Sequence, residues 1–190
     1  NLLSAFAGGV VFNLANILLV AAIGIAGMSV AFPVGIGIAL VLGVIVNYIS
    51  NPQGNPVLIF GGVALITLAI ILNAKAYQKL QTNAEGGVSK KGLIISVVSG
   101  CLMGLFYKYV AGSMVTNFNV PEAGKLSPYT ALVLFAIGIV ISSFVFNTLQ
   151  MMRPFSGTPV TFSTYFKGLT KDHLIGVLGG VIWCVGMSLS

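Results

Sequence analysis

Residues 57–76 read VLIFGGVALITLAIILNAKA, and this stretch decides the fold class. Lys75 is its single charged residue, and its apolar residues follow one another without a polar residue at every second position. A membrane-spanning strand alternates apolar and polar residues over about ten positions, whereas a membrane-spanning helix needs about 20 mostly apolar residues in a row. The stretch therefore predicts a transmembrane helix and excludes a membrane strand.

The composition of the whole chain agrees with this prediction. Of the 190 residues, 57% are hydrophobic and 6% are charged. Soluble domains carry about 25% charged residues, so an ordinary soluble domain is excluded. No Asp, Glu, Lys or Arg occurs between Asn1 and Ala74. At about 20 residues a helix, that length allows about three passes through a bilayer. We therefore expect an integral membrane protein.

Six apolar segments of this kind can be placed on the chain. A glycine turn at Gly27 follows the first, and the proline- and glycine-rich run 51–56 follows the second. Such residues end helices. We predict an all-α membrane protein with six transmembrane helices, at 2–25, 30–49, 57–76, 92–112, 128–149 and from about 174 onward, with polar loops at 78–91 and 150–173.

The basic residues predict how these helices are oriented. Two loops and their flanks hold seven of the nine Lys and Arg residues: Lys75, Lys79, Lys90, Lys91, Arg153, Lys167 and Lys171. The opposite side of the membrane keeps Lys108 and Lys125. Because cytoplasmic loops carry the excess of Lys and Arg, the loops 78–91 and 150–173 are predicted to be cytoplasmic. The net charge of +6 then needs no nucleic-acid partner.

The first and last segments share a short pattern. Residues 8–18 read GGVVFNLANIL, and residues 179–189 read GGVIWCVGMSL. The two segments cross in opposite directions, which is the arrangement of an inverted repeat in secondary transporters. The alternative is chance, since glycine and other small residues are enriched at membrane helix contacts generally. With a five-helix repeat, residues 1–77 would be the last three helices of the first repeat, 78–91 the cytoplasmic connection, and 92–190 the first three helices of the second repeat. The chain would then hold helices 3–8 of ten.

The chain also resembles a known family. The motifs that carry this resemblance are GGVVFNLAN at 8–16 and NTLQMMRP at 147–154, followed by Gly157-Thr158-Pro159. They are similar to the ureide permeases and the related glucose/ribose porters of the drug/metabolite transporter superfamily. The resemblance implies a ten-helix inverted-repeat carrier for a sugar or a ureide-like compound. Plant ureide permeases are expected to carry a long central loop with a phosphate-binding-like motif, whereas the loop here is short. That departure favours a bacterial relative in the inner (plasma) membrane.

Polar residues within the apolar segments are the candidates for a substrate site. Asn13 and Asn16 lie three positions apart, on one face of a helix, beside Phe12. Carboxamides both donate and accept hydrogen bonds, and an aromatic face can stack on a sugar ring or a planar ureide. The repeat places Trp183 and Met187 at the matching positions of the last helix. The alternative is that the two Asn side chains bond neighbouring helices as structural contacts.

Three further residues are candidates for a gate or for coupling. Lys108 could bind an anion or exchange a proton, or it could extend to the membrane interface from the last turns of its helix. Asn147 could line the substrate site or, with Gln150, an inner gate. The alternative for both is that they satisfy carbonyls at a helix end. Protons are a candidate coupling ion, although none of the six segments contains Asp or Glu.

Small residues recur every fourth position in three segments. This spacing lets helix backbones approach closely. The residues are Gly35, Ala39 and Gly43 in the second segment, Gly100 and Gly104 in the fourth, and Gly176 and Gly180 in the sixth.

Together these observations predict a secondary transporter, or permease. It would move a small neutral polar metabolite by alternating access, with the lipid bilayer as its surroundings. The alternative is a non-transporting membrane receptor or assembly subunit. An enzyme is not expected, because no catalytic Ser-His-Asp set and no metal-spaced cluster of ligands occurs, so neither cofactor nor metal is predicted. The pattern carries no signal for the oligomeric state.

Overall fold

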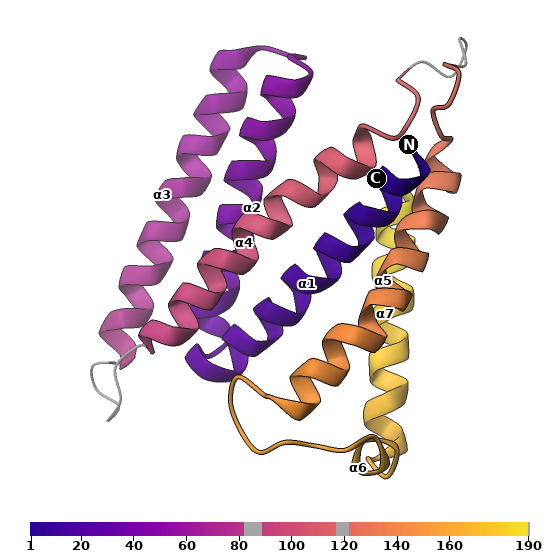
Figure 1. Cartoon of the computed structure of the whole chain (residues 1–190). Coiled ribbons are helices and arrows are strands. Elements are labelled where there is room, and N and C mark those ends of the chain that lie inside the picture. The colour runs from indigo at the N-terminus through magenta and orange to yellow at the C-terminus, as the bar shows by residue number, and fades with distance from the viewer. Residues whose placement is uncertain (82–88, 117–121, 190) are drawn as a thin grey trace. The chain divides into compact units, whose positions relative to one another are not determined.

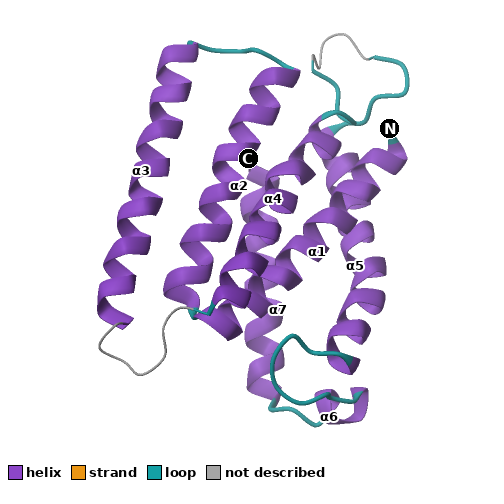
Figure 2. Ribbon diagram, turned by 60° about the vertical axis from the view of Figure 1, so that its left-hand side comes forward, coloured by secondary structure: helices purple, strands orange, loops and turns teal. Residues whose placement is uncertain are grey.

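A computed structural model describes residues 1–81, 89–116 and 122–189 of the chain. Within these residues the protein is helical and contains no strand (Figure 1, Figure 2). The helices are α1 (Leu2–Ala26), α2 (Met28–Ser50), α3 (Pro56–Gln81), α4 (Lys90–Ala111), α5 (Pro128–Met152), α6 (Phe162–Phe166) and α7 (Thr170–Leu189). All but α6 are long and apolar enough to cross a membrane. The predicted all-α membrane protein with six long helices is confirmed.

The boundaries of the helices differ from the prediction at two of the predicted loops. α3 continues to Gln81, and α4 begins at Lys90, so the predicted loop 78–91 is shorter, and its central residues 82–88 lie outside the described part of the chain. The predicted loop 150–173 contains the short helix α6, and α7 begins at Thr170. Polar residues at helix ends lower the local hydropathy without ending the helix, which accounts for both differences.

The chain forms two compact units, Asn1–Phe146 and Asn147–Ser190. The first holds α1 to α4 and most of α5. The second holds the end of α5, the following loop, α6 and α7.

In the first unit, α4 packs along both α1 and α2, and α3 packs on α2 (Figure 1). Small residues allow the close contact between α2 and α4. A Cβ on Gly100 would lie 2.5 Å from the carbonyl oxygen of Gly35, and one on Gly104 would lie 3.1 Å from that of Ala39. The small residues expected to allow close helix contact lie in this contact, although the sequence did not predict which helices would pair. Gly176 and Gly180, in contrast, have open space beside them within the second unit.

A single residue joins α1 to α2. Gly27 has φ +82°, a conformation that costs glycine little and other residues more. The chain therefore reverses direction at this point, and α2 begins at the next residue, Met28.

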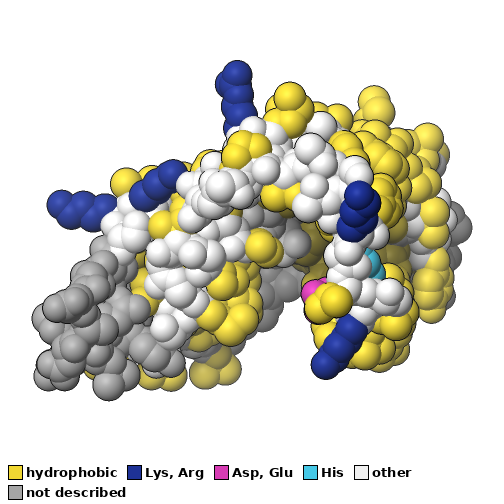
Figure 3. Space-filling model, turned by 90° about the horizontal axis from the view of Figure 1, so that it is seen from below, with side chains coloured by type: hydrophobic (Ala, Val, Ile, Leu, Met, Phe, Trp, Pro, Cys, Tyr) yellow, Lys and Arg dark blue, Asp and Glu magenta, His cyan; other side chains and the backbone are white. Residues whose placement is uncertain are grey.

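The second unit is built around α6 and the start of α7. The backbone N–H of Val160 donates to the carbonyl of Met151 at 2.9 Å, which ties the loop back to the end of α5. The ring of Tyr165 in α6 packs edge-on against His173 in the first turns of α7, with centroids 4.9 Å apart. In Figure 3, seen from below, Lys and Arg side chains project outward beside hydrophobic side chains.

Candidate functional site

Asn13 is buried in the middle of α1 and bonds to α5. Its Nδ2 donates to Ser142 Oγ at 2.8 Å, to Ser143 Oγ at 3.1 Å and to the carbonyl oxygen of Ile139 at 3.4 Å. Only 6% of the residue is exposed. Asn13 therefore makes the interhelical contact that the sequence left open as one of two alternatives.

The hydroxyl groups of the two serines determine which end of the carboxamide faces α5. Ser142 Oγ donates to the carbonyl of Gly138 at 2.7 Å, and Ser143 Oγ donates to that of Ile139 at 2.7 Å. Each hydroxyl hydrogen is thereby used within α5, so each oxygen can only accept from Asn13. The amide nitrogen must consequently face α5, and the amide oxygen must face away from it.

The amide oxygen of Asn13 is an unused acceptor. Within the described part of the chain Oδ1 accepts no hydrogen bond. Among the described residues, the one fully buried side-chain polar atom without a partner is His173 Nε2, so Asn13 Oδ1 keeps some accessible surface. A solute hydroxyl or N–H group could therefore donate to it.

Phe12 is part of an aromatic cluster formed by three helices. Its ring centroid lies 5.0 Å from that of Phe106 in α4 and 5.4 Å from that of Phe135 in α5. Phe106 and Phe135 are 5.7 Å apart, and Phe135 is 1% exposed. These tilted and edge-on contacts hold the three helices together beside Asn13. Phe12 is half-buried, so part of its surface remains open.

The crossing of α1 and α5 at this site depends on two glycines. A Cβ on Gly9 would collide with the carbonyl oxygen of Phe135, and a Cβ on Gly138 would collide with that of Phe6. The two backbones are therefore in contact, which brings the Asn13 carboxamide within reach of short serine side chains.

Asn16 lies one turn further along α1 and differs from Asn13. Its side chain is exposed, and it has no hydrogen-bond partner within the described residues. A separation of three positions rotates two side chains by about 60° around a helix axis. That rotation moves Asn16 out of the α1–α5 contact, so the structure separates the environments of the two predicted site residues.

The other predicted substrate residues belong to the second unit. On α7, Trp183 is 40% exposed and Met187 is half-buried, and their spacing of four places both on one face of the helix. At the end of α5, Asn147 is exposed and Gln150 is half-buried. Because these residues are described within their own unit, their approach to Asn13 stays a prediction.

Lys108 lies in the last turn of α4, and its side chain is exposed. Its neighbours Tyr107 and Tyr109 are 44% and 45% exposed. Lys and Tyr at a helix end are typical of a membrane interface. The structure therefore places Lys108 at one end of the first unit, away from Asn13 in the middle of α1.

Serines inside α4 and α5 are the residues that the sequence-based prediction missed. Ser142 and Ser143 complete the Asn13 contact, and Ser99 in α4 donates to the carbonyl of Ala15 at 2.7 Å. The sequence did contain a signal for these serines, because polar side chains inside apolar segments face other protein groups rather than lipid. No group of three potential metal ligands occurs among the described residues.

Comparisons with protein-family models, with curated proteins and with solved structures find no match for this chain.

Proposed function

We propose that this protein is a secondary transporter for a small neutral polar metabolite, with Asn13 in its substrate path. The ten-helix inverted repeat, the membership of the drug/metabolite transporter superfamily and a sugar or ureide-like substrate are taken from the sequence resemblance and are part of the same proposal. The observation that carries it is the Asn13 carboxamide, whose nitrogen bonds to α5 while its oxygen keeps accessible surface and no partner in the described chain.

Burial of a carboxamide in a membrane bundle has an energetic cost that favours a functional role. Polar side chains inside membrane segments are rare and face the bundle interior or a water-filled cavity. The contact with Ser142 and Ser143 offsets part of this cost for the nitrogen only. An oxygen with accessible surface in this position can accept a hydrogen bond from a solute as it passes.

The absence of carboxylates favours a neutral solute. Within the described residues, the six long helices contain one acidic side chain, Asp172, in the first turn of α7. A cationic substrate would lack a counter-charge in the interior of these helices, whereas hydroxyl and amide groups of a neutral solute can bond to Asn13 and Asn16. Since Lys108 is exposed at a helix end, the proposal gives it no coupling role.

Alternating access needs helices that can move against one another. In the contact of α2 with α4, Gly100 and Gly104 lie against both the backbone of α2 and its Ile38 and Leu42 side chains. The glycines themselves carry no side chain that would lock the two helices, and we expect such contacts to permit small sliding or rocking motions.

Uptake by the full-length protein in liposomes tests the proposal. A panel of radiolabelled sugars and ureides is offered to vesicles with and without protein, and uptake above the empty vesicles identifies a substrate. Asn13→Ala should then reduce uptake by about 5- to 150-fold, because a lost hydrogen bond to a buried group costs about 1–3 kcal/mol. Ser142→Ala is the matched control. It removes an Nδ2 partner and leaves Oδ1 in place, so it should lower thermal stability more than uptake. Equal uptake by the wild type and by folded Asn13→Ala would refute the site.

The cytoplasmic placement of 150–173 in a bacterial inner membrane is a separate part of the proposal. In a variant whose native cysteines are replaced, a single cysteine at Lys171 should react with a membrane-impermeant maleimide only after the cells are opened. A cysteine at Lys125 should react in intact cells. The reverse pattern would invert the proposed orientation.

A further inference from the structure

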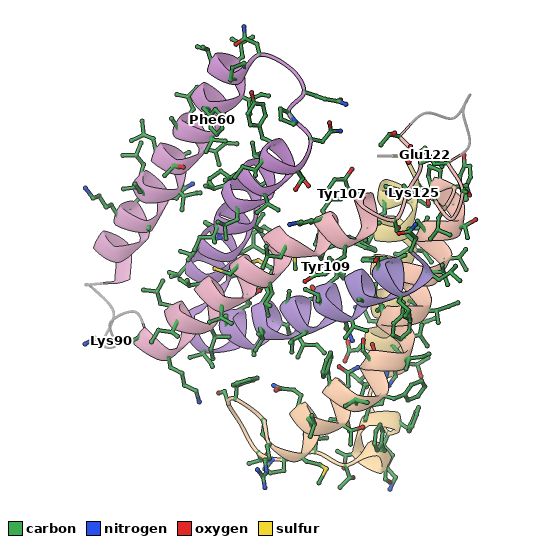
Figure 4. All side chains as sticks on the ribbon, turned by 45° about the horizontal axis from the view of Figure 1, so that its top comes forward. Phe60, Lys90, Tyr107, Tyr109, Glu122 and Lys125 are labelled. Atoms are coloured by element: carbon green, nitrogen blue, oxygen red, sulfur yellow. The ribbon has the colours of Figure 1, made fainter. Side chains whose placement is uncertain are left out.

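A recess lies where the start of α1 meets the end of α4. It has a volume of about 300 Å³ and is lined by Ser4, Leu105, Lys108, Tyr109 and Gly112. Figure 4 shows Tyr107 and Tyr109 at this end of α4, with Lys125 and Glu122 in the segment beyond it and Lys90 at the opposite end of the helix.

The lining residues carry unused hydrogen-bond donors. Lys108 has no ion-pair or hydrogen-bond partner within the described chain, and neither do the hydroxyl groups of Ser4 and Tyr109. An ammonium and two hydroxyl groups around one recess offer donors to an anion with several oxygen atoms.

A second ammonium lies at the rim of this recess. Lys125 Nζ donates to the carbonyl of Gly112 at 2.7 Å, and Gly112 lines the recess. The nearest acidic side chain in the same segment, Glu122, accepts from Thr116 Oγ1 at 2.9 Å and forms no ion pair with either lysine in the described residues. The described residues therefore do not neutralise the positive charge of the two lysines.

The surroundings of the recess are apolar and typical of a membrane interface. Leu105 in its wall is 38% exposed, and Leu2 and Tyr107 nearby in the sequence are 59% and 44% exposed. Tyrosine beside lysine at a helix end is found at the headgroup level of a bilayer. An anion held here would have hydrocarbon on one side and water on the other.

We infer that this recess binds a phosphate group, and that the phosphate belongs to the headgroup of an anionic phospholipid. The donors of Lys108, Lys125, Ser4 and Tyr109 contact the phosphate oxygens, and the acyl chains lie along the exposed Leu105 side of α4. This role goes beyond the proposed transport of a neutral solute, and it uses none of the residues assigned to the substrate.

Lipid binding to the purified full-length protein tests the inference. The protein is stripped of lipid in detergent, and native mass spectrometry measures its affinity for phosphatidylglycerol, for diacylglycerol and for inorganic phosphate. Phosphatidylglycerol should bind, and diacylglycerol, which lacks the phosphate, should bind much more weakly. Lys108→Gln should weaken phosphatidylglycerol binding about fivefold, as expected for one basic residue at an anionic surface.

Lys90→Gln is the matched control. Lys90 lies at the other end of the same helix and is also exposed, so its loss should leave this affinity unchanged within about twofold. Lys108→Arg keeps the charge and should retain binding. Equal weakening by Lys90→Gln and Lys108→Gln would show unspecific attraction and overturn the inference, as would equal binding of diacylglycerol. If inorganic phosphate bound as tightly as phosphatidylglycerol and with the same dependence on Lys108, the phosphate site would stand and its assignment to a lipid would be wrong.

Discussion

A methyl group at Gly138 tests whether α1 and α5 meet backbone to backbone. A Cβ at this position would collide with the carbonyl oxygen of Phe6 and lie 3.3 Å from Cα of Gly9. Backbone atoms cannot swing aside as a side-chain end can, so the helices must separate. Overpacking of this kind costs about 1–3 kcal/mol. With about 2–4 °C of Tm for each kcal/mol in a chain of this length, Gly138→Ala should lower Tm by about 2–12 °C.

Gly62→Ala in α3 is the matched control, because the same methyl group meets no atom within 4 Å there. Alanine is the better helix former by about 0.8–1.0 kcal/mol, so this variant should be as stable as the wild type or more stable. Both proteins are purified in detergent, heated in steps, and assayed by the fraction that remains monodisperse on size exclusion. A Gly138→Ala protein that is as stable as Gly62→Ala would falsify the close crossing, and with it the geometry that brings Asn13 to α5.

Two further predictions concern buried polar atoms. Ser99→Ala removes the hydrogen bond from α4 to the Ala15 carbonyl of α1 and should lower the free energy of unfolding by about 0.6–1 kcal/mol. Ser188→Ala is the control and should cost close to nothing, because its exposed hydroxyl bonds within its own helix. Equal Tm shifts of the two variants would contradict a stabilising bond between α4 and α1. His173→Phe keeps a ring beside Tyr165 and removes the buried Nε2 that has no partner, so thermal unfolding should show an equal or higher Tm; a clear decrease would mean that Nε2 is satisfied.

The helices could be predicted because their signal is local. About 20 apolar residues in a row have one stable state in a bilayer, and their backbone groups must be satisfied within the segment. The ends of the helices were harder to predict from the sequence. α7 begins at Thr170, ahead of the predicted 174, because its polar first turn is helical without being apolar. α6 at Phe162–Phe166 was missed because it is too short to show a periodic pattern.

The candidate site was predictable only in part, because its partners come from a distant segment. Helical spacing puts Asn13 and Asn16 within about 60° of each other around α1, but it could not show that Asn13 is buried against α5 while Asn16 is exposed. That choice depends on the crossing of α1 and α5 at Gly9 and Gly138, two residues that are 129 positions apart in the sequence. The hydroxyl of Ser142 became part of the site only through this crossing.

The nitrogen and the oxygen of the Asn13 carboxamide have different roles, and this difference connects the fold of this protein with its proposed function. The nitrogen of Asn13 holds α1 against α5, and the serine hydroxyls that accept from it have already donated their hydrogens to α5. The oxygen consequently cannot be turned toward α5 without placing two acceptors face to face, so its direction is set by the helix contact itself. A recognition group that is oriented in this way needs no charge to be held in place. That property suits the proposed carrier, whose described helix interiors contain no carboxylate, and the proposal therefore predicts that Asn13 affects both stability and solute selection.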